Sequence, residues 1–264
     1  MSELPGHAVI LALESSADQA SAAVLHADGR HWQQRHAARH GHAAMITELA
    51  RNVLEQAGMT AAALSHVAAG RGPGSFTGIR VALAAAKGFA LATGASGIGV
   101  SCLAAMAHEA HGTPDLAGRR LVATADTRRG SYFCQLHDPA AGAHAPVEDI
   151  PPESGQDVPD AWRGATIIGP GAAALAAAFP DHAMTPIADR LPVDALQIAR
   201  LAAHHLASGH PADPLTPLYV APAFLGPAPP PASPSTPAKT SAPPPAPAPD
   251  AVPDGRPAPH SGGS

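Results

Sequence analysis

Prolines concentrate at the end of this chain and limit how much of it can fold. Of the 30 prolines among 264 residues, 14 lie between Pro227 and Pro259. That stretch has no aromatic residue, and Val252 is its only branched aliphatic residue. Burial of this small apolar surface cannot offset the conformational entropy that the chain would lose on ordering. Residues 226–264 are therefore predicted to be disordered. About 225 residues remain, enough for a sizeable core or a two-lobed body.

Charge and cysteine content exclude several classes of protein. The formal net charge is −5, and Lys87 and Lys239 are the only lysines beside 14 arginines. A free-standing nucleic-acid-binding protein needs a concentrated basic face, so this balance argues against that class. Two cysteines, Cys102 and Cys134, do not make a disulfide framework. Glu14 interrupts the first apolar run, and no stretch approaches the roughly 20 apolar residues of a membrane span. These features predict a cytoplasmic protein without a membrane segment.

Apolar runs and turn signals predict strands that alternate with helices. Strands are expected at 8–13, 20–25, 31–32, 65–70, 97–100, 121–125, 132–136 and 166–168. Helices are expected at 42–58, 76–93, 102–111, in the alanine-rich segment after 171, and at 192–208. The opening order of strand, polar turn and strand recurs after residue 120, which predicts two related lobes of an α/β fold. We place the first lobe at 1–101, completed by 212–225, and the second lobe at 102–211.

The sharpest motif runs from Gly70 to Arg80 and reads Gly-Arg-Gly-Pro-Gly-Ser-Phe-Thr-Gly-Ile-Arg. Glycines permit a tight turn, Ser75 suits an N-cap, and the free N–H groups of a helix N-terminus suit an anion. Gly78 in the first turn costs about 1 kcal/mol relative to Ala, which predicts a close neighbour. The motif lacks the Gly-Lys-Ser/Thr of a Walker loop. Two interpretations stay open: a capped turn that packs two elements, or an anion or nucleotide site. The residues of that site would be Gly72, Gly74, Ser75, Thr77 and Arg80.

Other polar groups give weaker indications of chemistry. Glu14, Ser15 and Ser16 follow the first strand and would place a carboxylate and two hydroxyls in a cleft, unless they form only a turn. Asp126 follows a later strand in the same way. The 16 histidines show no metal-ligand spacing with Cys or carboxylates, so no metal site is predicted. No Ser-His-Asp or Cys-His arrangement can be assigned, so no catalytic residue is predicted.

Residues 72–80, followed by an alanine-rich helix with Lys87 and Gly88, resemble the hallmark of the TsaB (YeaZ) family of tRNA threonylcarbamoyladenosine biosynthesis proteins. Residues 10–16 resemble the family's first strand, although Asp is commoner there than Glu14. The helix beginning at His42, the turn 126–130 and Pro217-Leu218-Tyr219 resemble further family elements. The resemblance covers residues 8–222.

The resemblance implies a fold and a role. The family has the two-lobed fold of sugar kinases, actin and Hsp70, which is ribonuclease H-like. It is a non-catalytic scaffold for its paralogue TsaD, which works with the ATPase TsaE. Their complex transfers threonylcarbamoyl to N6 of the adenosine 3′ of the anticodon, in tRNAs that read codons starting with A. The resemblance implies no cofactor of its own beyond weak nucleotide binding. ATP and metal belong to the partner subunits, and tRNA contact is expected only within the complex.

One local comparison separates the two paralogues. TsaD-type chains carry Val-Asn-His-x-x-x-His after the corresponding strand, and the two histidines bind the metal. Here the segment is Val-Ser-Cys-Leu-Ala-Ala-Met, with Cys102 and Met106 at the histidine positions. Such a pair would not hold iron or zinc in catalytic geometry. The chain therefore resembles the non-catalytic member.

The family docks to TsaD through helices of the first lobe. The helix at 76–93 has small apolar residues on more than one face, so one face can cover the sheet while another meets a partner helix. Interface candidates are His42, Met45, Leu49, Ile79, Leu83 and Ala86. Without the partner, this surface is expected to pair with a second copy of the chain.

Two enzyme functions stand as alternatives. A kinase-like or acyl-transferring ATP-dependent enzyme of the same fold would use Glu14, Ser15, Ser16, Asp126 and residues 169–171 around a nucleotide. The turn after Leu13 lacks the Asp-x-Gly-Thr character of active kinases, which weighs against it. A peptidase would need a metal pair or an activated nucleophile, and the sequence shows neither.

Overall fold

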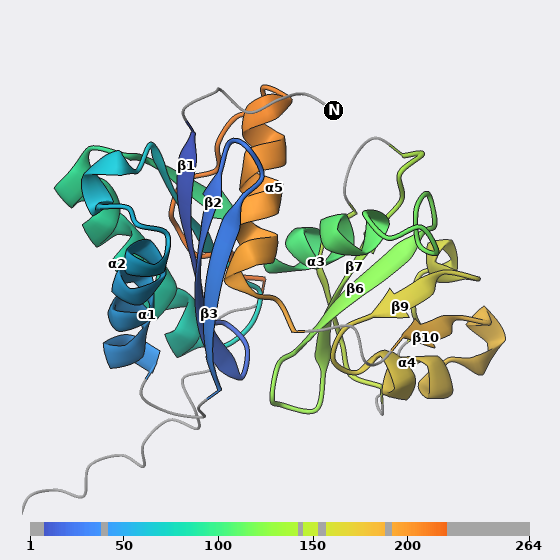
Figure 1. Cartoon of the computed structure of the whole chain (residues 1–264). Helices are drawn as coiled ribbons and strands as arrows, with labels where there is room; N and C mark the ends of the chain where they lie inside the picture. Colours follow the sequence, from blue (N-terminus) through green and yellow to red (C-terminus); the bar gives the residue numbers. More distant parts are fainter. Residues whose placement is uncertain (1–7, 38–41, 142–144, 153–156, 188–191, 221–264) are drawn as a thin grey trace, which may run out of the picture. The chain divides into compact units, whose positions relative to one another are not determined.

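A computed structural model describes residues 8–37, 42–141, 145–152, 157–187 and 192–220. Contacts divide the chain into one unit at 1–223 and another at 224–264. The first unit contains two five-stranded sheets, each with helices packed on it (Figure 1). The predicted disordered tail, 226–264, lies outside the described residues.

The two sheets share one topology. The first comprises β1 (Val9–Glu14), β2 (Gln19–His26), β3 (His31–Ala37), β4 (His66–Gly70) and β5 (Ser96–Val100), in the order β3-β2-β1-β4-β5. The second comprises β6 (Leu121–Asp126), β7 (Tyr132–His137), β8 (Glu148–Ile150), β9 (Thr166–Ile168) and β10 (Thr185–Ile187), in the order β10-β9-β6-β7-β8. In each sheet the first three strands pair antiparallel and the last two join in parallel. The predicted duplication and two-lobed α/β fold are therefore confirmed.

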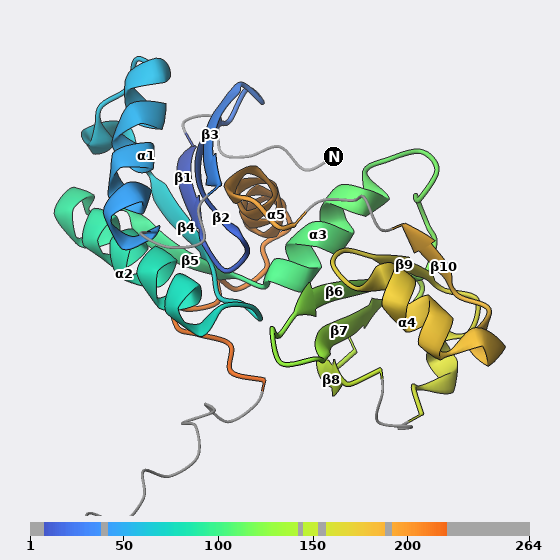
Figure 2. The same cartoon turned by 90° about the horizontal axis from the view of Figure 1, so that it is seen from below.

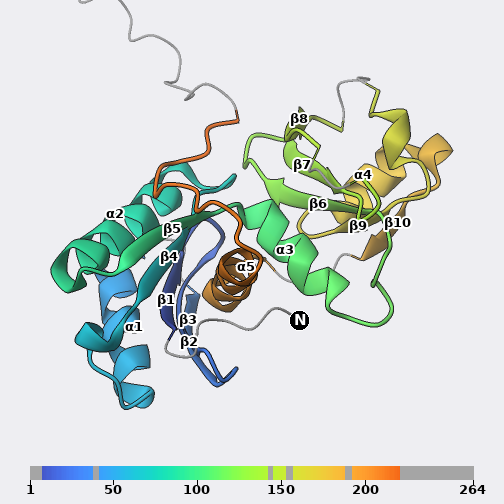
Figure 3. The ribbon, with the colours of Figure 1, turned by 90° about the horizontal axis from the view of Figure 1, so that it is seen from above.

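Helices cover both faces of the first sheet. The helices are α1 (His42–Gln56), α2 (Phe76–Thr93), α3 (Cys102–His111), α4 (Ala172–Ala178) and α5 (Ala195–Ala207), with 3₁₀ turns at Ala61–Ala63, Asp160–Trp162 and Pro180–His182. The pair α1 and α2 packs on one face of this sheet and α5 on the other, while α3 packs on the second sheet and on α5 (Figures 2 and 3). The predicted second lobe, 102–211, included α5. That part of the predicted boundary is wrong, because α5 packs on the first sheet.

Strand β1 forms the centre of the first lobe because its side chains are buried on both faces. Val9, Leu11 and Leu13 pack in the cluster under α1 and α2. Ile10 and Ala12 pack in the cluster that includes α3 and α5. This alternation follows from the two-residue period of a strand.

The structure buries most of the predicted interface. Leu49, Ile79, Leu83 and Ala86 are at most 5% exposed and lie in the core between α1, α2 and the sheet. The prediction that these four side chains meet a partner is wrong, because the sequence pattern does not say which helix face covers the sheet. Met45 is half-buried, and the side chain of His42 lies outside the described part of the structure.

Within the described residues, α2 is long and apolar enough to cross a membrane by length and composition, with a mean hydropathy of 1.2. The sequence prediction finds no such segment. Length and apolar composition are weak evidence for a membrane span, because core helices of water-soluble proteins pass the same test. Here Ala82 and Leu83 pack against the sheet, and Arg80 and Lys87 lie within the helix.

Candidate functional site: the interlobe cleft and the outer face of α2

A cavity of about 280 Å³ lies between the two sheets. It is lined by the turn after β1, the loop before α2, the start of α3 and the end of β6. Its lining residues are Ser16, Ala17, Asp18, Pro73, Gly74, Cys102, Met106, Thr124, Ala125, Asp126, Arg128, Pro170, Pro192 and Val193. Of the nine predicted nucleotide or anion residues, the structure brings Ser16, Gly74 and Asp126 together here.

The turn after β1 packs directly on the start of α2. Ser15 Oγ donates a hydrogen bond of 2.7 Å to the Gly78 carbonyl, and Ser75 N donates one of 2.8 Å to the Ser16 carbonyl. A Cβ atom at Gly78 would lie 1.8 Å from the Ser15 carbonyl oxygen. The close neighbour predicted at Gly78 is therefore confirmed. Because Ser15 is buried and its hydroxyl is used in this contact, it does not line the cavity.

Glu14 is enclosed and does not open into the cavity. Its carboxyl group is fully buried, accepts a hydrogen bond from Ser16 N, and accepts one of 3.4 Å from Cys102 Sγ. A Cβ at Gly70 would lie 1.6 Å from Glu14 Oε2, so glycine at that position leaves room for the carboxyl group. Burial raises the pKa of Glu14, and the hydrogen bonds from Ser16 oppose the rise. The expectation that this carboxylate lies in the cleft is not met.

This raised pKa predicts how stability depends on pH. The folded protein holds the Glu14 proton more tightly than the unfolded chain, whose glutamate pKa is about 4.3. The stabilisation is therefore complete below about pH 4.3 and is lost as the pH rises through the folded pKa of Glu14. Glu14→Gln should remove this loss, so the variant should gain stability relative to the natural chain between pH 4.5 and 8. Urea unfolding across this range measures it. Glu48→Gln, at an exposed position on α1, is the control and should not gain in this way.

Thr77 and Arg80 face away from the cleft and line a separate groove of about 430 Å³ beside α1. The Arg80 guanidinium lies 3.7 Å from the centre of the Phe76 ring and donates hydrogen bonds of 3.0 and 3.2 Å to the Tyr219 hydroxyl. The predicted anion set is therefore divided between two faces. Sequence reasoning did not pair Tyr219 with Arg80, although the Pro-Leu-Tyr element that contains Tyr219 was recognised.

The remaining predicted positions have structural partners. Gly72 has a φ of +96°, and a Cβ there would lie 2.6 Å from Ile79 Cδ1. Asp126 Oδ1 accepts a hydrogen bond of 2.7 Å from Arg128 N. The Arg128 side chain forms an ion pair with Asp18, which joins the two lobes at the edge of the cavity.

The cleft residues do not form a metal site in the described structure. No group of three or more His, Cys, Asp or Glu residues that could hold a metal ion occurs among the described residues. Cys102 and Met106 are buried and line the cavity. Burial raises the pKa of the Cys102 thiol, and the nearby Glu14 carboxylate raises it further. This cysteine therefore stays a neutral thiol near neutral pH.

Comparison with known proteins gives consistent matches. Residues 34–143 match the family model described as TsaD, tRNA N6-adenosine threonylcarbamoyltransferase. The tRNA threonylcarbamoyladenosine biosynthesis protein TsaB of Escherichia coli (strain K12) is 35% identical over 92 residues, which are 35% of this chain and 39% of that protein. TsaB of Haemophilus influenzae is 33% identical over 128 residues, which are 48% of this chain and 53% of that protein. The chain thus spans about half the length, or less, of the curated relatives it matches.

Two solved structures match over a longer range. YeaZ from Pseudomonas aeruginosa has 28% sequence identity and a TM-score of 0.65, covering 80% of this chain and 99% of that one. A Pseudomonas aeruginosa protein described as similar to peptidase YeaZ has 26% identity and a TM-score of 0.66, covering 81% and 100%. The sequence motifs, the curated relatives and these structures agree, and each of them shows that the chain is similar to TsaB (YeaZ) proteins.

Proposed function

We propose that this chain is a non-catalytic subunit that docks to a TsaD-type protein and supports transfer of threonylcarbamoyl to tRNA. The curated relatives support a role in this pathway, since they are tRNA threonylcarbamoyladenosine biosynthesis proteins. In this proposal TsaD supplies the metal and the active site, and TsaE binds to the pair formed by this chain and TsaD. The chain contacts tRNA only within that complex. In the same proposal the chain uses no cofactor of its own and acts in the cytoplasm.

The observation that carries this proposal is the outer face of α2. Three large hydrophobic side chains are exposed in the described structure, Leu91 at 89%, Tyr219 at 53% and Phe76 at 43%. Two belong to α2, and the Tyr219 ring centre lies 6.0 Å from that of Phe76. Ala84 and Gly88 are exposed on the same helix, between Phe76 and Leu91.

This face is suited to a partner helix. Small side chains let two helices approach closely, and exposed apolar surface favours burial against another protein. Arg80 and Lys87 are exposed on the same helix and add positive charge to this face. When TsaD is absent, pairing of this face with a second copy would cover the same surface.

Reconstituted transfer tests the function. The chain, TsaD and TsaE from the same organism are combined with tRNA, threonine, bicarbonate, ATP and the enzyme that makes the threonylcarbamoyl adenylate. We expect modified adenosine only when both the chain and TsaD are present, and no ATP turnover by the chain alone. Transfer that proceeds equally without the chain would overturn the proposal. ATP turnover by the isolated chain would favour the kinase-like alternative instead.

A further inference from the structure

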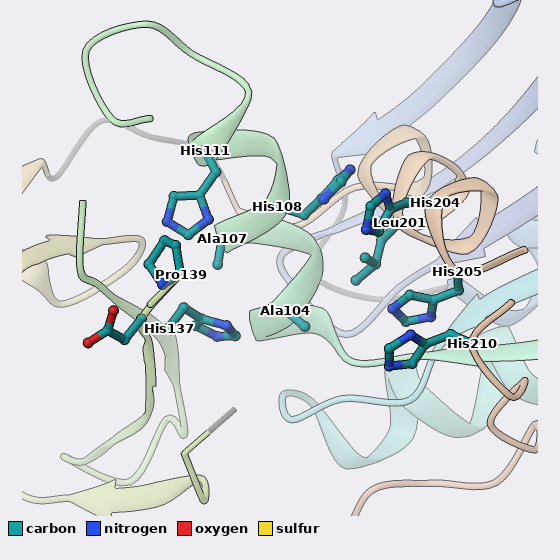
Figure 4. Close-up of a pocket in the computed structure, with 11 residues that line it drawn as sticks. Ala104, Ala107, His108, His111, His137, Pro139, Leu201, His204, His205 and His210 are labelled. Atoms are coloured by element: carbon teal, nitrogen blue, oxygen red, sulfur yellow. The ribbon is translucent and has the colours of Figure 1, made fainter. Parts of the chain in front are cut away.

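Histidines gather around a second cavity, of about 200 Å³, on a different part of the first unit from the cleft cavity. Six of the 16 histidines of the chain line it: His108, His111, His137, His204, His205 and His210 (Figure 4). The cavity is also lined by Ala104, Ala107, Asp138, Pro139 and Leu201. The proposed function uses none of these residues.

The cavity lies where the two lobes meet. Its walls come from α3, the end of β7 and α5 with the turn that follows. Helix α3 packs on β6 and β7 of the second sheet, α5 packs on β1 and β2 of the first, and the two helices pack on each other. A change at this pocket would therefore act on the contact between the lobes.

The histidine rings contact one another within and across the helices. The ring centres of His108 on α3 and His204 on α5 are 4.9 Å apart. His205 and His210 stack with their centres 5.2 Å apart, and 6.4 Å separates the centres of His204 and His205. Neutral imidazoles can pack at these distances, whereas imidazolium rings repel each other there.

The nearby charged groups already have partners. Glu109 on α3 forms an ion pair of 2.5 Å with Arg200 on α5, and Asp213 forms one of 2.7 Å with Arg71. His111 Nε2 lies 3.0 Å from the Arg119 carbonyl. Asp138 lines the pocket and accepts a hydrogen bond of 2.9 Å from Ala140 N. The carboxylates of Glu109 and Asp213 are thus already paired with arginines. If several histidines of the pocket gain a proton, Asp138 is the lining carboxylate that can offset their positive charges.

We propose that this histidine pocket is a proton-sensitive joint, in which protonation at mildly acidic pH weakens the packing of α3 on α5 and loosens the contact between the two lobes. Helix α3 carries residues of both cavities, since Cys102 and Met106 line the cleft and His108 and His111 line the histidine pocket. Loosening this helix would therefore also change the cleft.

The direction of the effect follows from the titration of the histidines. Burial lowers the pKa of His108, and the neighbouring His204 lowers it further. Burial, with His210 and His204 beside it, lowers the pKa of His205 to about 4. A histidine freed from the joint titrates near pH 6.5, so the closed joint is fully stable above that pH and loses stability as the pH falls toward 4. At pH 5.5 this difference for His205 alone favours the open joint by about tenfold.

Hydrogen exchange of the full chain at pH 7.5 and 5.5, corrected for the intrinsic exchange rate, tests the joint. We expect the opening equilibrium of the amides in both α3 and α5 to rise at least about tenfold at pH 5.5, while amides of α1 and α2 stay unchanged. His205→Gln should remove most of this rise. His31→Gln, at an exposed position on β3, is the matched control and should keep it.

A second variant keeps the test decisive if His205→Gln does not fold. His108→Gln removes the contact across the helices and should reduce the same rise in α3 and α5. Equal protection of α3 and α5 at both pH values would overturn the proposal. So would a rise confined to the last turn of α5, or a rise that persists in every folded histidine-pocket variant.

Discussion

Gly78→Ala is expected to destabilise the protein by about 3 kcal/mol or more, because no space exists for one methyl group at this position. The added Cβ would lie 1.8 Å from the carbonyl oxygen of Ser15 and 2.8 Å from its carbonyl carbon. Both contacts are with backbone, so relief requires the turn after β1 to move away from α2. That movement would break the 2.7 Å hydrogen bond from Ser15 Oγ to the Gly78 carbonyl.

Gly88→Ala is the matched control, because it makes the same change in the same helix. A Cβ at Gly88 meets nothing within 4 Å, and the residue is exposed. Alanine favours helix over glycine, so this variant should gain about 0.5–1 kcal/mol. Urea unfolding of both variants measures the difference. Similar stabilities for the two alanine variants would show that the turn and the helix do not approach as described.

Leu83→Ala and Leu91→Ala should differ strongly although both truncate a leucine of α2. Leu83 is 3% exposed and packs in the core beneath the helix, whereas Leu91 is 89% exposed. The first change leaves a cavity and should cost about 2–5 kcal/mol of unfolding free energy. The second should stay within about 0.5 kcal/mol of the natural chain.

This pair shows which face of α2 covers the sheet. Thermal or urea unfolding of the two variants under the same conditions is sufficient. The opposite order, with Leu91→Ala the more damaging, would mean that the helix is turned about its axis. In that case the outer face proposed for docking would be the core face.

Most of the fold could be predicted from local signals. Helix α2 was predicted with its observed ends, because Ser75 caps its start and Gly94, in the left-handed conformation at φ 74°, ends it. Strands β1, β2, β4 and β5 were found because their apolar runs end in clear turns, whereas only the first two residues of β3 were predicted, because its sequence is mostly polar. The repeat of strand, turn and strand predicted two related lobes, and the shared strand order of the two sheets agrees with that prediction.

The elements that were missed have weak local signals. β8 and β10 have three residues each, and Pro186 stands in the middle of β10, so pairing at a sheet edge defines them rather than propensity. The assignment of α5 to the first lobe depends on packing between distant segments. Sequence order alone does not reveal that contact.

The candidate site was predicted less well than the fold, for a physical reason. Motif spacing marked Glu14, Ser15, Thr77 and Arg80 as candidate site residues. It did not indicate that Glu14 and Ser15 are buried, or that Thr77 and Arg80 face a groove outside the cleft. The helical period of α2 gave several apolar faces without saying which one is covered. Only the packing of α1 and the sheet on Ile79 decides it.

Sedimentation velocity of the chain mixed with TsaD from the same organism tests the central claim most directly. Ala84→Glu puts a charge on the outer face of α2, and Ala177→Glu makes the same change at an exposed position of α4. The account predicts a heterodimer with the natural chain and with Ala177→Glu, and an affinity at least about tenfold lower with Ala84→Glu, which is about 1.4 kcal/mol. Failure of the natural chain to bind TsaD would contradict this account. So would an Ala84→Glu variant that binds TsaD as tightly as Ala177→Glu does.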